Sequence, residues 1–147
     1  MEKINIYYLP DISEEEKKIF REVFKENELQ FSEYKVKGIL WGSFDLQVII
    51  DFLNNPAVNA AVTGGTAILL IHSLIKRIFQ RNRNKIEDNN TRPRYTNLVF
   101  RMKKKNIVIS NANDKNEIMI SRVSTEFSLN KTEKYSEEKL EEYIKED

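Results

Sequence analysis

His72 is the residue in this chain whose type best suits acid–base or metal chemistry. The chain has 147 residues, one histidine and no cysteine, so disulfides, a thiolate nucleophile and a zinc–cysteine site are all excluded. A metal site needs several ligands, and His72 stands by itself in the most apolar stretch of the sequence. We therefore expect a packed or interfacial histidine rather than a catalytic base.

Two other polar patterns are too incomplete to form a site. The run TGGT at residues 63–66 lacks the lysine and hydroxyl pair that completes a phosphate loop. Asn111, Asn113 and Glu117 resemble part of a calcium loop. Lys115 stands at a would-be ligand position, however, and the loop glycine is missing. The sequence therefore predicts no enzyme activity, no metal and no cofactor.

Charge is distributed unevenly along the chain. Residues 76–105 hold 11 lysines and arginines against 2 carboxylates, although the whole chain has a net charge of only +1. Such a segment is either solvated linker and strand, or a basic patch for nucleic acid, acidic lipid or an acidic partner. Because Tyr95 interleaves with these cations, a nucleic-acid-binding module is an alternative function. The cations of the basic patch are Lys76, Arg77, Arg81, Arg83, Lys85, Arg92, Arg94, Arg101, Lys103, Lys104 and Lys105.

The elements that must position these residues begin with a predicted βαβ unit over residues 1–38. Residues 4–10 are β-branched and aromatic and end at proline, which favours a strand. Ser13 and Glu16 form a capping-box signature, and apolar residues at helical spacing follow it. A second strand is expected at 30–38, and the two strands should pair through a right-handed crossover.

The middle of the chain predicts a helical segment over residues 43–80, broken near Pro56. From Phe52 to Ile75 no residue is charged, and a Gly-Gly pair lies inside this stretch. Each glycine within a helix costs about 1 kcal/mol relative to alanine, so close packing or a helix break should offset the pair. A basic polar linker is expected over residues 81–95, where a proline argues against helix.

Three interpretations of the uncharged helix compete. A membrane span needs about 20 predominantly apolar residues. Residues 57–75 are nearly long enough, and a single-span or peripheral membrane protein is therefore a second alternative. The polar and small residues throughout this stretch make a span less favourable than a core helix. A buried core helix accounts for the small residues. The second half is apolar around most of its circumference, which indicates a self-association or partner surface. The predicted interaction surface is Ala57, Ala61, Gly64, Gly65, Ile68, Leu69, Ile71, His72, Leu74, Ile75, Ile78 and Phe79.

The last third predicts β-structure over residues 96–124 and a terminal helix over 135–146. The β-region holds a hairpin and a candidate further strand at 117–123. The chain as a whole, 1–147, is expected to form one α+β domain: a sheet of about four strands with helices mainly on one face.

The order of these elements, with NAAVTGGTAILLIHSLIKRIFQR at residues 59–81, resembles the bacterial effector-associated constant component family. The pattern covers roughly residues 45–110. The resemblance implies a small non-enzymatic component of a conflict or immunity system, encoded beside an effector. On that basis we expect a cytoplasmic adaptor that forms homo-oligomers or docks an effector protein through the 57–79 helix.

Overall fold

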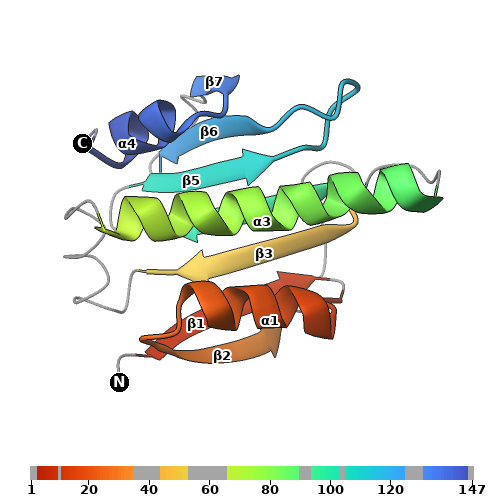
Figure 1. The fold of residues 1–147 in the computed structure, drawn as a ribbon. Helices are drawn as coiled ribbons and strands as arrows, with labels where there is room; N and C mark the ends of the chain where they lie inside the picture. The colour runs from red at the N-terminus through yellow and green to blue at the C-terminus, as the bar shows by residue number, and fades with distance from the viewer. Residues whose placement is uncertain are drawn as a thin grey trace.

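The structure is a computed structural model, and it describes residues 3–9, 11–34, 44–52, 66–89, 94–102, 105–124 and 131–145. Within these ranges the strands form one mixed sheet in the order β2-β1-β3-β4-β5-β6-β7. Figure 1 shows α1, α3 and α4 side by side on one face of that sheet. The elements are β1 (Lys3–Leu9), α1 (Glu14–Val23), β2 (Glu28–Glu33), β3 (Leu46–Asp51), α3 (Thr66–Asn89), β4 (Thr96–Arg101), β5 (Lys105–Ser110), β6 (Met119–Ser124), β7 (Lys131–Lys134) and α4 (Glu137–Lys145).

The prediction of a sheet with about four strands is wrong, because the sheet has seven. β3 lies within the segment 43–80 that was predicted to be helical. Its burial alternates in the period-two manner of a strand, with Leu46, Val48 and Ile50 facing the helices. A six-residue segment with four apolar residues, LQVIID, fits either period, and the β-branched residues Val48, Ile49 and Ile50 favour the strand.

The predicted linker over residues 81–95 is also corrected, because α3 continues to Asn89. Residues 81–89 contain no glycine or proline, and their arginine, lysine and glutamate residues are good helix formers. The predicted break at Pro56 and the Gly-Gly pair lie outside the described residues. None of the helices in the described ranges is both long enough and apolar enough to cross a membrane.

The predicted βαβ unit agrees with the parallel pairing of β1 and β2 around α1. The capping box is formed: Ser13 N donates to Glu16 Oε1 at 3.0 Å, and Glu16 N donates to Ser13 Oγ at 3.1 Å. A second parallel pair, β3 with β4, encloses α3 in the same way. These two units join through the antiparallel pairing of β1 with β3, which places α1 beside α3.

The remaining strands form an antiparallel series from β4 to β7, closed by α4. The strand β7 was not predicted, because its four residues, KTEK, have no apolar pattern. Contacts with α4 hold it in place: the Tyr143 hydroxyl donates to Glu133 Oε2 at 2.7 Å, and Lys139 Nζ lies 3.3 Å from Glu133 Oε1. The buried Lys105 Nζ donates to the carbonyl of Ile144 at 2.8 Å, which fixes the end of α4.

We predict that the contact between Tyr143 and Glu133 contributes acid-sensitive stability. The hydrogen bond from Tyr143 lowers the pKa of Glu133 below its usual value. A lowered folded-state pKa stabilises the fold above the unfolded pKa, and this contribution is lost as the pH falls through the folded pKa. Tyr143→Phe should therefore raise the pKa of Glu133 in an NMR titration of the side-chain carboxyl carbon.

The matched control for this titration is Glu142. Its pKa is lowered first by a hydrogen bond from Lys139, so Tyr143→Phe should leave it unchanged. The prediction fails if the pKa of Glu133 does not move, or if both carboxyl groups shift together.

Candidate functional site

The sheet has a second face, away from the helices, and its side chains come from the alternate positions of the strands. On β3 these are Gln47 and Ile49, and on β4 they are Asn97, Val99 and Arg101. The first four of these side chains are half-buried and the Arg101 side chain is exposed. None of the three described helices covers this face, which we call the helix-free face.

One row of register partners crosses six strands of the helix-free face. Its centre is β-branched, since Ile49, Val99 and Val108 pair across β3, β4 and β5. One end is aromatic, and the other carries hydroxyl groups, with Ser121 Oγ 3.0 Å from Thr132 Oγ1. In order the row is Tyr7, Ile49, Val99, Val108, Ser121 and Thr132.

A hollow of about 590 Å³ lies over this row from Ile49 to Thr132. Small-molecule sites are mostly clefts of roughly 300–1,000 Å³ with apolar walls and a few polar groups. The size and the mixed lining of the hollow therefore match those of a small-ligand site. The lining residues are Tyr34, Phe44, Gln47, Ile49, Asn97, Val99, Arg101, Asn106, Val108, Ser110, Ala112, Ser121, Val123 and Thr132.

The polar groups of the hollow are mostly neutral amides and hydroxyls. Asn97 Nδ2 donates to Gln47 Oε1 at 3.4 Å, which is a long hydrogen bond. The Oδ1 atom of Asn97 is buried and accepts no hydrogen bond within the described part of the chain. An unsatisfied buried acceptor costs about 1–3 kcal/mol, so a donor that reaches this oxygen would be favoured.

Six members of the predicted interaction surface belong to the core between α3 and the sheet. They share one face of α3 at helical spacing and are all buried. Leu69 is 59% exposed, and Leu70 beside it is half-buried. Ala57, Ala61, Gly64 and Gly65 lie outside the described residues. The six buried members are Ile68, Ile71, Leu74, Ile75, Ile78 and Phe79.

His72, the remaining member of that surface, connects α3 to the start of α4. Its Nδ1 atom lies 2.5 Å from the Tyr135 hydroxyl, the two rings stack, and its Nε2 atom lies 3.6 Å from Glu137 Oε2. Burial raises the pKa of the Tyr135 hydroxyl, so that hydroxyl keeps its proton near neutral pH. The contact between His72 and Tyr135 links two segments that are 63 residues apart in the sequence.

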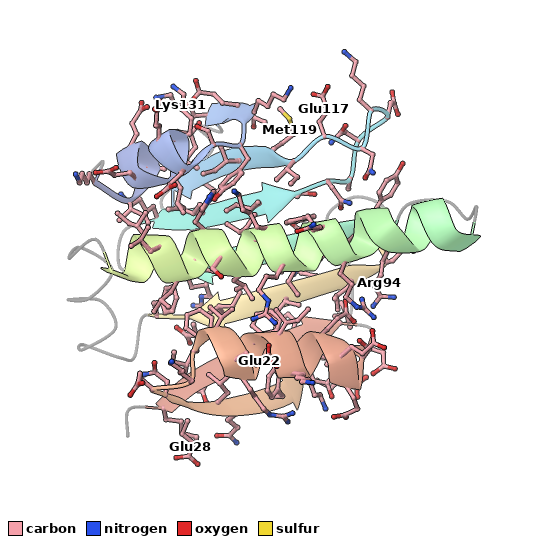
Figure 2. The ribbon with its side chains drawn as sticks, in the orientation of Figure 1. Glu22, Glu28, Arg94, Glu117, Met119 and Lys131 are labelled. Atoms are coloured by element: carbon pink, nitrogen blue, oxygen red, sulfur yellow. The ribbon has the colours of Figure 1, made fainter. Side chains whose placement is uncertain are left out.

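The described cations of the basic patch lie in several different places. Arg77 pairs with Glu22 of α1 on the helical side, where Figure 2 labels that carboxylate. Lys76 is exposed on α3, and Lys105 is buried beneath α4. Arg101 lies on the opposite, helix-free face. Arg92, Lys103 and Lys104, and the side chains of Arg83 and Lys85, lie outside the description. The described members therefore do not form one basic surface.

Two further cations of the patch meet a buried carboxylate of α1. Glu16 is 1% exposed, and its Oε1 atom lies 3.3 Å from Arg94 Nη2 while its Oε2 atom lies 3.7 Å from Arg81 Nη1. Arg81 also pairs with the exposed Glu15 at 2.7 Å. Figure 2 shows Arg94 near the N-terminal end of α1. These arginines hold α1, α3 and the start of β4 together.

The calcium-loop resemblance has a structural explanation. Asn113 Oδ1 accepts from the backbone N–H groups of Lys115 and Glu117, each at 3.1 Å, so the side chain closes a turn. Asn116 has a φ of 54°, which asparagine adopts more readily than most residues. Among the described residues, no group of three or more histidine, aspartate and glutamate side chains is arranged to hold a metal ion.

Sequence reasoning missed the hollow, although part of its signal was present. The alternation in TNLVFR and KNIVIS predicts two-faced strands, with Asn97, Val99, Asn106 and Val108 on one side. Residues 46–51 were predicted to be helical, so the part of the hollow that β3 lines was not predicted. No family model, curated protein or solved structure matches this chain, so the family resemblance stays a prediction.

Proposed function

We propose that the protein is a non-enzymatic recognition component whose ligand surface is the hollow on the helix-free face. The observation that carries this proposal is a hollow of about 590 Å³ built by five consecutive strands, with β-branched side chains at its centre and amides and hydroxyls around them. The paired strands hold these residues in one register before a ligand arrives, which lowers the entropic cost of binding.

The lining favours binding over catalysis. General acid–base chemistry needs a titratable group such as histidine, carboxylate or lysine at the reacting atoms. The described residues that line the hollow include hydroxyls, at Tyr34, Ser110, Ser121 and Thr132, but no histidine, carboxylate or lysine. A hydroxyl without an adjacent base is a hydrogen-bonding group rather than a nucleophile.

The scale of the surface supports a small molecule as the occupant. A stable protein–protein interface buries about 800 Å² on each partner and is centred on anchor residues. The nucleic-acid alternative needs a continuous cationic surface, and the described cations of the basic patch are dispersed over both sides of the sheet. A small ligand needs only the hollow itself.

The adaptor role implied by the family resemblance is compatible with this proposal. A component that binds a small molecule on one face and has the exposed Leu69 on the other can connect a signal to an effector protein. We retain that role, in a bacterial conflict system, as part of the proposed function.

Ligand-induced stabilisation tests the proposal. Soluble metabolites that bind the native protein should raise its melting temperature, because a ligand stabilises the state that it binds. Val108→Trp fills the centre of the hollow and should abolish these shifts. Leu69→Trp introduces the same side chain on the opposite side and should preserve them.

Two results would overturn the proposed function. One is that no compound in a broad metabolite panel raises the melting temperature of the wild-type protein. The other is that the shifts persist in a folded Val108→Trp variant, which would place the ligand elsewhere.

A further inference from the structure

Arg101 differs from the other arginines described above. Arg77, Arg81 and Arg94 each pair with a carboxylate of α1. Arg101 is exposed at the end of β4 and lines the hollow, and no described residue makes a hydrogen bond or ion pair with its guanidinium. Asp51 is its register partner on β3, yet no ion pair joins the two side chains. A guanidinium placed in this way is available to an anion from solution.

We propose that the ligand of the hollow is a small organic anion, and that its carboxylate or phosphate group pairs with Arg101. This inference rests on the proposed function. Arg101 is the one charged side chain among the described residues that line the hollow, so it sets the sign of the site. Arginine suits the role because its planar fork donates two parallel hydrogen bonds to a carboxylate or a phosphate.

The rest of the hollow defines the body of the ligand. Asn106, the register partner of Arg101 on β5, adds an amide beside the anionic group. Along β4, Val99 follows at the centre and Asn97 at the far end, about 13 Å from Arg101 at the usual rise of a strand. The ligand should therefore carry an apolar or aromatic middle.

The far end of the hollow predicts a hydrogen-bond donor on the ligand. Asn97 Oδ1 accepts no hydrogen bond within the described residues, and Gln47 and Ser110 lie in register beside Asn97. A donor on the ligand would satisfy this oxygen once the amide turns toward it. The inferred ligand has three parts in a line: an anionic head, an apolar middle and a polar tail.

Two fluorescent probes test the charge assignment directly. Anilinonaphthalene sulfonate and N-phenyl-1-naphthylamine share an apolar body, and only the first carries an anionic group. The wild-type protein should bind the sulfonate more tightly. Arg101→Gln should weaken sulfonate binding about tenfold, as expected for the loss of one charge-assisted pair, and should change binding of the neutral probe less than about twofold.

Further variants separate this inference from the proposed function. Arg77→Gln removes an arginine on the helical side and should alter neither probe. Val108→Trp should weaken both probes. Near-UV circular dichroism of each variant must match the wild type, since the sulfonate also binds partly unfolded states. Displacement by naphthoate and by naphthyl phosphate then identifies the preferred anionic group, with naphthamide as the neutral competitor.

Each outcome is decisive for one of the two proposals. If Arg101→Gln weakens both probes equally, or if naphthamide competes as well as both anions, the anion assignment is wrong while the hollow remains a ligand site. If Val108→Trp affects neither probe, the hollow is not their binding site, and the proposed function fails together with the inference.

Discussion

Replacing Glu16 with alanine should lower the free energy of unfolding by about 3–5 kcal/mol, the usual cost of removing one partner of a buried ion pair. The carboxylate is 1% exposed and lies between Arg81 and Arg94. Its loss leaves the two guanidinium groups without this partner and also opens the capping box of α1. Urea unfolding followed by circular dichroism measures the change.

Glu15→Ala is the matched control for this measurement. Glu15 is the preceding residue of the same helix and contacts the same Arg81, but its side chain is 71% exposed. Exposed ion pairs contribute at most about 1 kcal/mol, so the two variants should differ several-fold. Equal losses would mean that burial does not control the contribution of this network.

The second large effect concerns two leucines of α3. Leu74 is fully buried, whereas Leu69 is 59% exposed. Leu74→Ala should cost about 2–5 kcal/mol, because it removes transfer free energy and leaves a cavity. Leu69→Ala should change stability by less than about 0.5 kcal/mol. Thermal unfolding at two protein concentrations, combined with sedimentation velocity, measures both values.

The concentration dependence decides what covers Leu69. If Leu69→Ala destabilises the protein as much as Leu74→Ala, and does so only at high concentration, a second copy of the chain covers this side chain. If it destabilises at every concentration, Leu69 contributes to the core of the single chain. A small effect at both concentrations leaves α3 as a core helix with one exposed leucine.

The sequence was most informative where local rules and tertiary packing agree. The capping box at Ser13 and Glu16, the terminal helix capped by Ser136 and the parallel β1–β2 pair all follow from short-range patterns. The hairpin of β4 and β5 follows from two β-branched runs. The bounds were predicted less well than the element types, since the second strand was expected at 30–38 and β2 spans Glu28–Glu33.

Prediction failed where a short pattern fits two periods or where long-range contacts supply the stability. The apolar pattern at residues 46–51 fits a helix or a strand, and pairing with β1 and β4 stabilises the strand that its β-branched residues favour. The strand β7 has no apolar signal and depends on β6 and α4. The charged end of α3 was predicted to be a linker. Its residue Arg81 pairs with Glu15, which lies 66 residues away in the sequence, and such a contact has no local signal.

The candidate site was missed for the same reason. The hollow depends on the register of five strands, and without β3 the pairing of β4 with the β1–β2 unit is not predicted. The basic patch was predicted because its lysines and arginines are close together in the sequence. In the fold, Arg81 and Arg101 lie on opposite sides of the sheet. Lining residues with ordinary types, such as Val99 and Asn97, become recognisable only when strand order is known.

The two edge strands have a consequence for self-assembly of the sheet. Among the described strands, β2 and β7 form the edges. If β2 paired antiparallel with β2 of another copy over its full length, Glu28 would oppose Glu33. The same pairing of β7 would set Lys131 against Lys134. Like charges directly opposite each other are destabilising, so each edge repels its own copy and guards an open seven-stranded sheet against edge-to-edge aggregation.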